Sequence, residues 1–314
     1  MNNKTAVQEQ LMAVNNSGRW IKRAFYSQHA APYVFISPFV ITFLLFQLYP
    51  IISSVIMSFQ EIIPGETKFI GLKNYQDLNN EHFFKAIWNS LRYTFWSLVV
   101  LLPFPMLLAV FLNSTNMVAK NFFRSTLFMP ALTSIIVGGA IFRLVFGTLE
   151  TAPANVFLSL FGFESVKWTS SAGAGMFIMV ALASWRWMGV NLIYFLSGLQ
   201  SIPQELYEAA EMDGANRFTQ FFRITLPLLK PVTVYVLTIS IFGGFAMFTE
   251  SFVFWNTQSP SDIGLTIVGY LYQQSFEFFN MGFGSAIGIA FLFIVLSINI
   301  LQLLITGQFR KENE

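Results

Sequence analysis

The sequence of 314 residues contains no cysteine and only two histidines. Without cysteine, the chain can form no disulfide and offers no thiolate to a metal ion or a substrate. The two histidines, His29 and His82, belong to different segments, whereas a metal site needs several ligands that converge. We therefore expect neither a metal site nor thiol chemistry in this protein.

Motifs that carry catalysis are also absent from the sequence. There is no phosphate-binding G-x-x-x-x-G-K-[ST] loop and no Gly-Lys dipeptide, so any ATP-driven step must be powered by another polypeptide. Neither H-E-x-x-H nor G-x-S-x-G occurs, and no two carboxylates are adjacent within an apolar stretch. We expect a protein that is not an enzyme and that itself binds no cofactor.

Charged residues are scarce, at 11% of the chain, and the basic ones are spread among short polar segments. A nucleic-acid-binding surface needs basic side chains gathered on one face, so no nucleic-acid partner is expected. Hydrophobic residues make up 54% of the sequence, and 37 residues are phenylalanine. Soluble domains do not reach this balance, which indicates a protein that crosses a membrane several times.

Six almost uncharged stretches are each long enough to cross about 30 Å of hydrocarbon as a helix of roughly 20 residues. They cover residues 32–59, 86–113, 122–147, 172–199, 228–255 and 283–306. Prolines inside these stretches, among them Pro103 and Pro130, are expected to kink their helices. The predicted fold class is an all-α integral membrane protein with six transmembrane helices.

Lysine and arginine predict the orientation of these helices, because short loops rich in them stay on the cytoplasmic side. With the N-terminus inside, eleven basic loop residues lie in the cytoplasm and four lie outside. We therefore expect two cytoplasmic tails, at residues 1–31 and 307–314. Between them we expect a first transmembrane helix at 32–60, an extracytoplasmic loop at 61–85 and a core of five helices at 86–306. This is the organisation of a multi-pass protein of the cell membrane.

Residues 201–227 form the longest polar interruption in the apolar second half of the chain. Ser201, followed three residues later by Gln204, matches a capping box, in which each side chain satisfies a backbone N–H at the start of a helix. Pro203 is well suited to the first turn, where a missing N–H costs nothing. The pattern predicts a helix over residues 203–212.

A turn and a second helix are predicted to follow in the same segment. Asp213-Gly214 is a turn signal, because glycine adopts the positive φ that ends a helix and reverses the chain. The second helix should cover residues 215–225, and Leu226-Pro227 should stop it. An amphipathic connector on the membrane surface would have the same local features.

The order of residues in this segment is more specific than its amphipathicity. Glu208-Ala209-Ala210 is followed four positions later by Gly214, and Leu226-Pro227 closes the segment. This resembles the cytoplasmic EAA loop of permease subunits of bacterial ABC importers. Residues 69–75 and 123–130 are similar to two further landmarks of that family, so the resemblance covers nearly the whole apolar region. The chain is most similar to sugar permeases of the maltose-permease type and, within these, to the arabino-oligosaccharide permeases of Gram-positive bacteria.

The resemblance implies a type I ABC importer permease fold in a bacterial cell membrane. The implied function is that of a transmembrane subunit in an ATP-driven, binding-protein-dependent importer of a sugar or oligosaccharide. The implied partners are a second homologous permease, a cytoplasmic ATPase dimer that uses ATP and magnesium, and an extracytoplasmic solute-binding protein or lipoprotein. The EAA loop would dock in a cleft of the ATPase. The implied coupling residues are Glu208, Ala209, Ala210, Asp213, Gly214, Leu226 and Pro227.

Charges inside the apolar stretches are few, and each carries a cost in a membrane. Arg186 lies near the middle of the fourth stretch, and Glu250 is the only carboxylate well inside one, so we expect the two to face one cavity and interact. Sugars bind aromatic faces and planar polar groups, and the resemblance implies that these helices line the translocation path. The candidate path residues are Arg186, Trp187, Asn191, Phe248, Glu250 and Ser251. The alternative is that these residues only pack against lipid and neighbouring helices, with one buried ion pair.

Two other functions compete with the importer. A secondary transporter driven by an ion gradient would carry repeated halves with broken helices and a relay of intramembrane carboxylates, whereas Glu250 stands alone. A membrane-embedded enzyme would need a cluster of titratable groups, which the sequence lacks.

Overall fold

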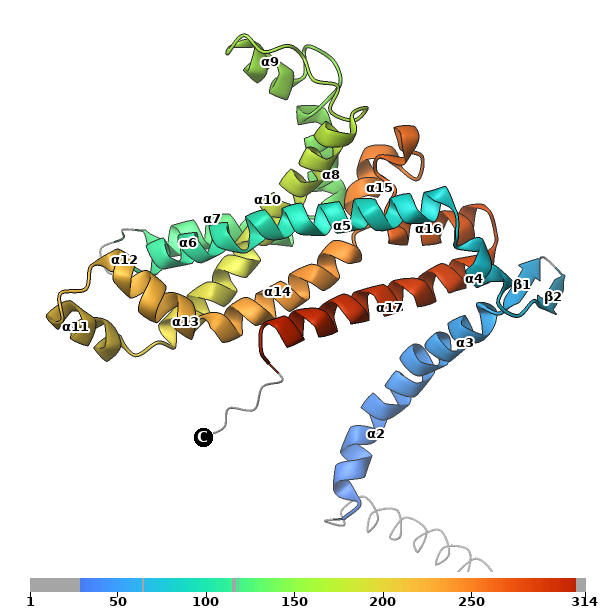
Figure 1. The fold of residues 1–314 in the computed structure, drawn as a ribbon, viewed down its shortest axis with the longest axis horizontal. Helices are drawn as coiled ribbons and strands as arrows, with labels where there is room; N and C mark the ends of the chain where they lie inside the picture. Colours follow the sequence, from blue (N-terminus) through green and yellow to red (C-terminus); the bar gives the residue numbers. More distant parts are fainter. Residues whose placement is uncertain (1–28, 64, 115–116, 118, 309–314) are drawn as a thin grey trace, which may run out of the picture. The chain divides into compact units, whose positions relative to one another are not determined.

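A computed structural model describes residues 29–308, apart from residues 64, 115, 116 and 118 (Figure 1). The predicted tails at 1–31 and 307–314 therefore lie almost wholly outside the described residues. The chain separates into two compact units, residues 1–56 and 57–314. The second unit contains every residue singled out as a candidate site.

The helix of the first unit shows how a proline is tolerated inside an apolar helix. It consists of α2 (Ala31–Phe43), the π-helical turn η1 (Leu44–Leu48) and α3 (Tyr49–Met57), whose last residue belongs to the second unit. Pro38 has no N–H for the carbonyl of Val34, and the hydroxyl of Ser37 donates to that carbonyl at 2.8 Å instead. The carbonyl freed by the proline is thus satisfied locally, and the helix continues.

The second unit is mostly helical. Its elements before residue 200 are β1 (Gln60–Ile63), β2 (Glu66–Phe69), α4 (Lys73–Asp77), α5 (Glu81–Leu101), α6 (Pro103–Asn113), α7 (Lys120–Leu132), α8 (Ile135–Val145), α9 (Pro153–Ser159) and α10 (Ala172–Gln200). After them come α11 (Gln204–Met212), α12 (Arg217–Gln220), η2 (Phe221–Thr225), α13 (Leu226–Leu228), α14 (Lys230–Phe245), α15 (Thr249–Trp255), η3 (Pro260–Asp262), α16 (Ile267–Tyr272), η4 (Gln273–Glu277) and α17 (Met281–Ile305).

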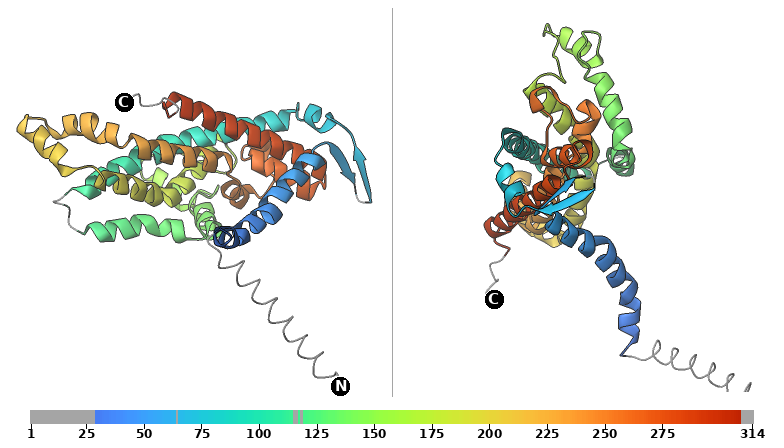
Figure 2. Two further views of the ribbon diagram at one scale, coloured as in Figure 1. Left: turned by 90° about the horizontal axis from the view of Figure 1, so that it is seen from below. Right: turned by 90° about the vertical axis from the view of Figure 1, so that its right-hand side faces the viewer.

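Most of the long helices of this unit pack against α10. Helix α10 contacts α5, α6 and α7, and α14 lies between α5 and α17. The short helices α11 and α12 lie at one end of the unit, and the β-hairpin and α16 lie at the opposite end, in both Figure 1 and Figure 2. We call these the α11 end and the α16 end.

Among the described residues, five helices have the length and composition needed to cross a membrane. They are Ala31–Met57, Glu81–Asn113, Ala172–Gln200, Lys230–Trp255 and Met281–Ile305. The third predicted stretch, 122–147, is instead a pair of helices, α7 and α8, bent by 97°. The bend is far larger than a proline kink and falls at Thr133 and Ser134, whose extended backbone follows Pro130 in the last turn of α7. Counting this pair as one broken span brings the number to six.

The β-hairpin was not predicted from the sequence. Strands β1 and β2 pair antiparallel, from Gln60 opposite Phe69 to Ile63 opposite Glu66. The side-chain amide of Asn74 donates to the carbonyls of Ser58 and Gln60, each at 2.9 Å, and so fixes the start of the hairpin on α4. A two-stranded hairpin is a marginal structure on its own, so this anchoring matters.

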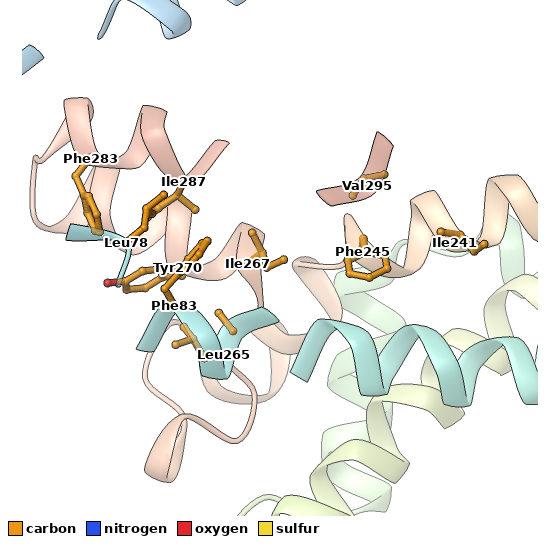
Figure 3. Close-up of a cluster of buried hydrophobic side chains, with 11 residues drawn as sticks. Leu78, Phe83, Ile241, Phe245, Leu265, Ile267, Tyr270, Phe283, Ile287 and Val295 are labelled. Carbon is orange, nitrogen blue, oxygen red and sulfur yellow. The ribbon is translucent and has the colours of Figure 1, made fainter. Parts of the chain in front are cut away.

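Three clusters of buried side chains form the core of the second unit. The cluster at the α16 end joins four parts of the chain, as Figure 3 shows for Phe83 of α5, Phe245 of α14, Tyr270 of α16 and Ile287 of α17. A second cluster surrounds the first half of α10, and a third joins α6 to the second half of α10 and to Leu229. The third cluster supports the base of the polar segment 201–227.

Candidate coupling and substrate sites

Helix α11 carries the Glu-Ala-Ala motif and is an exposed helix at its end of the unit. It covers Gln204–Met212, one residue shorter than predicted, and it contains no buried residue. Its side chains include Glu205, Glu208 and Glu211 but no lysine or arginine, so its surface is acidic. The small side chains of Ala209 and Ala210 allow a partner to approach this part of the helix closely. A helix of this kind suits a cleft in a partner that offers basic or N–H groups.

The turn after α11 has the predicted geometry. Gly214 has φ +77°, and its N–H donates to the carbonyl of Glu211 at 2.9 Å. The N–H of Ala215 donates to the carbonyl of Ala210 at 2.8 Å. These bonds close the end of the helix and reverse the chain after Asp213.

The predicted capping box at the start of α11 is wrong. The hydroxyl of Ser201 donates to the carbonyl of Gly198 at 2.7 Å, so it completes the end of α10. The N-cap residue of α11 is Pro203, and no side chain caps the helix. Only two residues separate the end of α10 from Pro203, so Ser201 is still within reach of the carbonyls that α10 leaves free.

The second helix of the segment also differs from its prediction. Asn216 caps it by accepting the N–H of Thr219 at 2.9 Å, and α12 passes into the π-helical turn η2. Pro227 does not stop it, because the backbone stays helical through Leu228 in α13. The wider turn of η2 gives the proline ring room that a regular α-helix denies it. Leu226 packs against the third buried cluster, whereas Pro227 is exposed.

One contact in this segment joins residues that no local pattern relates. The hydroxyls of Tyr207 in α11 and Thr225 in η2 are 2.9 Å apart, within hydrogen-bonding distance. They are 18 residues apart in the sequence, and neither was predicted as a functional residue.

The six candidate path residues fall into two groups in the structure. Asn191 is 3% exposed, and its amide donates to the carbonyl of Leu101 at 2.9 Å. That carbonyl lacks its helical partner because Pro105, four residues on, has no N–H. Ser251 is also buried, and its hydroxyl donates to the carbonyl of Gly264. The polar groups that were expected to bind a sugar thus have structural partners: Asn191 joins α10 to α5, and Ser251 joins α15 to the turn before α16.

Of the remaining candidates, Arg186, Trp187 and Phe248 keep polar or aromatic surface available, whereas Glu250 is buried. The guanidinium of Arg186 lies 5.3 Å from the ring centroid of Trp187, a cation–π contact, and Trp187 is 42% exposed. Phe248 precedes α15 and packs its ring against Phe252 and Tyr272. Glu250 lies in the first turn of α15 and is 8% exposed.

Arg186 and Glu250 do not form an ion pair. Among the residues that the structure describes, no ion pair includes either one, and the Nε atom of Arg186 is buried without a hydrogen-bond partner. A buried donor without a partner is costly, so this site suits a ligand that supplies an acceptor.

Comparison with known proteins identifies the family. Residues 102–311 match the model of the family described as "Binding-protein-dependent transport system inner membrane component". The chain belongs to this family. It is therefore a multi-pass membrane permease component of an ABC transporter and not an enzyme.

Two relatives and one solved structure define the similarity further. The chain is 59% identical over 288 residues to the arabinooligosaccharides transport system permease protein AraP of Bacillus subtilis (strain 168), and the match covers 92% of both proteins. It is 52% identical to AraP of Halalkalibacterium halodurans, again over 92% of both. The fold matches a chain of a bacterial alginate ABC transporter crystallised with a periplasmic protein that binds an alginate pentasaccharide. That match has a TM-score of 0.79 and 24% identity, and it covers 93% of this chain and 98% of the other.

Proposed function

We propose that this chain is one of two permease subunits that form the membrane pathway of an importer for arabino-oligosaccharides. The observation that carries the proposal is the 59% identity to the B. subtilis arabino-oligosaccharide permease, which extends over 92% of both chains. Similarity of this degree along almost the whole length supports a shared cargo as well as a shared fold. The H. halodurans relative is also an arabino-oligosaccharide permease by name and supports the same cargo.

The partners in this proposal follow from the family. A second, homologous permease would complete the pathway, a cytoplasmic ATPase dimer would bind ATP and magnesium, and an extracytoplasmic binding protein would deliver the sugar. The ATPase would grip α11, and its closure on ATP would open the pathway to the outside. Hydrolysis would then return the pathway to the cytoplasmic side.

The proposed topology has six spans, with the bent pair α7 and α8 as the third. Both tails, residues 1–31 and 307–314, and the α11 end would lie in the cytoplasm, and the loop 61–85 would lie outside. The excess of lysine and arginine in the loops at that end supports this orientation.

Thiol labelling tests the orientation, because the chain has no cysteine of its own. Glu164 and Gln308 are both exposed and make no side-chain hydrogen bond in the described part of the chain. We expect Glu164→Cys to react with a membrane-impermeant maleimide in intact cells, and Gln308→Cys to react only after permeabilisation. If Gln308→Cys were labelled in intact cells and Glu164→Cys were protected, the true topology would be the reverse of the proposed one. Helix α11 would then lie outside the cytoplasm.

The sugar pathway in this proposal is centred on Arg186, Trp187 and Glu250. Trp187 offers an aromatic face, and the two charged groups offer planar hydrogen-bonding groups to hydroxyls. Phe248 would add a second ring, while Asn191 and Ser251 would fix the helices that present these groups. The unpartnered Nε atom of Arg186 supports this assignment.

Uptake assays with charge-neutralising variants test both the cargo and the pathway. In cells that lack their own copy of this permease, we expect the wild-type chain to restore uptake of radiolabelled arabino-oligosaccharides. Arg186→Gln and Glu250→Gln should each reduce uptake by about tenfold or more, because each leaves one charge without its counterpart in a region of low dielectric. The double variant should be less impaired than either single variant.

Two outcomes would contradict these assignments. Strictly additive effects of the single and double variants would show that the two charges act independently. If sugar uptake into energised vesicles depended on an ion gradient and did not require ATP, the chain would instead act as an ion-coupled secondary transporter.

A further inference from the structure

Helix α11 is connected to the rest of the unit by little more than its two chain ends. At one end residues 201–203 lead from α10, and at the other the Gly214 turn leads into α12. In the part of the chain that the structure describes, the Tyr207–Thr225 contact is the only side-chain hydrogen bond between α11 and any other element. Among side-chain hydrogen bonds, a load applied to α11 therefore has this one route into the unit.

Thr225, at the other end of that hydrogen bond, is anchored to the core of the unit. Thr225 is 5% exposed and is the last residue of η2. Its carbonyl accepts the N–H of Leu229 at 2.9 Å, and Leu229 is fully buried in the third core cluster. Phe221, at the start of η2, packs against the same cluster. Thr225 thus moves with the base of α14, which begins one residue after Leu229.

The covalent route is less direct. From Tyr207 the chain runs through the rest of α11, the exposed turn at Gly214 and then α12 before it reaches Thr225. Glycine in such a turn resists bending weakly. The hydrogen bond bypasses the turn and joins the middle of α11 to the foot of α14.

We propose that the Tyr207–Thr225 hydrogen bond is a strut that transmits movement of α11 to α14, and through α14 to α15 and Glu250. The inference rests on the proposed coupling role of α11. Tyr207 and Thr225 are positioning residues, because they fix the angle of α11 and contact neither sugar nor nucleotide. Without the strut, α11 would still dock, but it would swing about the Gly214 turn and pass on less of the ATPase movement.

The complete transporter, reconstituted in proteoliposomes with its ATPase and binding protein, tests the strut. We expect Tyr207→Phe and Thr225→Val each to lower the ratio of sugar transported to ATP hydrolysed by about three- to tenfold, the range that the loss of one hydrogen bond supports. The double variant should be no worse than either single variant, because each alone breaks the bond. Assembly with the ATPase should be unchanged in all three.

Two matched variants separate coupling from general damage. Thr225→Ser keeps the hydroxyl and should retain the wild-type ratio. Thr219→Val removes a hydroxyl in the same segment whose one hydrogen bond among the described residues is to Asn216, and it should also retain the ratio.

The strut and the coupling role of α11 fail in different ways. If Glu208→Ala lowers sugar uptake and sugar-stimulated ATP hydrolysis while Tyr207→Phe and Thr225→Val leave the ratio at the wild-type value, α11 couples without the strut and the inference is wrong. If Glu208→Ala leaves both uptake and sugar-stimulated hydrolysis unchanged, the proposed coupling role itself fails. A fall in the Thr219→Val variant equal to that of Thr225→Val would show a general effect of the segment and would also overturn the strut.

Discussion

Replacing Gly189 by alanine should prevent the chain from accumulating as a folded protein. Gly189 lies on the face of α10 that packs against α7. A Cβ atom at this position would lie 2.0 Å from the carbonyl oxygen of Leu127 and 2.7 Å from the Cα of Phe128. Both are backbone atoms, so no rotamer change can relieve the clash. The two helices would have to separate along the contact.

The expected cost is large for a change of one methyl group. Overpacking of cores that can adjust costs about 1–3 kcal/mol, and a clash with backbone should exceed this range. A typical domain is stable by only about 5–15 kcal/mol. We expect the yield of monodisperse protein in mild detergent, measured by fluorescence-detected gel filtration, to fall by about tenfold or more.

Gly173 provides the matched control in the same helix. A Cβ there would meet no atom within 4 Å. Gly173→Ala should therefore leave the yield unchanged or raise the Tm slightly, because alanine favours a helix over glycine by about 1 kcal/mol. A normal yield and Tm for Gly189→Ala would mean that α7 and α10 do not approach as closely as the structure shows.

The sequence predicted where the long helices lie but not where they break. Hydropathy placed α10 at 172–199, and the structure has Ala172–Gln200. It did not reveal the 97° bend between α7 and α8, because an apolar stretch has the same composition whether it is straight or folded back. The hairpin Gln60–Phe69 was not predicted because the composition of its strands does not show what holds it in place. Its position depends on Asn74, which lies outside both strands.

The candidate sites were predictable to the extent that they depend on local pattern. The α11 helix and the Gly214 turn follow from neighbouring residues, and both were predicted. The contacts of Ser201, Asn191 and Tyr207 depend on which carbonyl or hydroxyl the fold brings near. Asn191, for example, bonds to the carbonyl of Leu101, 90 residues away, and nothing in the sequence around it indicates this. Polar residues in membrane helices therefore need a structure before structural and functional roles can be separated.

Changes in the coupling segment should leave the protein folded and yet impair sugar-stimulated ATP hydrolysis and transport together. Gly214 has φ +77°, and a Cβ there would meet no atom within 4 Å, so any substitution acts through the backbone alone. A β-branched residue is strained at positive φ by about 1–2 kcal/mol. Gly214→Val should relieve that strain by re-aiming α11. Glu208→Ala should remove a charged contact with the ATPase while α11 stays helical, since alanine is the strongest helix former.

In reconstituted complexes we expect both variants to reduce sugar-stimulated ATP hydrolysis and sugar uptake by about tenfold, the scale of a lost hydrogen bond to a charged group. Complex yield and capture of the sugar-loaded binding protein should match the wild type. Gly214→Asn, which tolerates positive φ, and Glu211→Ala, which removes another carboxylate of the same helix, should retain most activity. If Gly214→Val and Glu208→Ala both kept wild-type ATP hydrolysis and sugar uptake, this segment would be only a surface connector. Because the segment is where ATPase movement would enter the permease, that result would also remove the mechanical basis of the proposed import cycle.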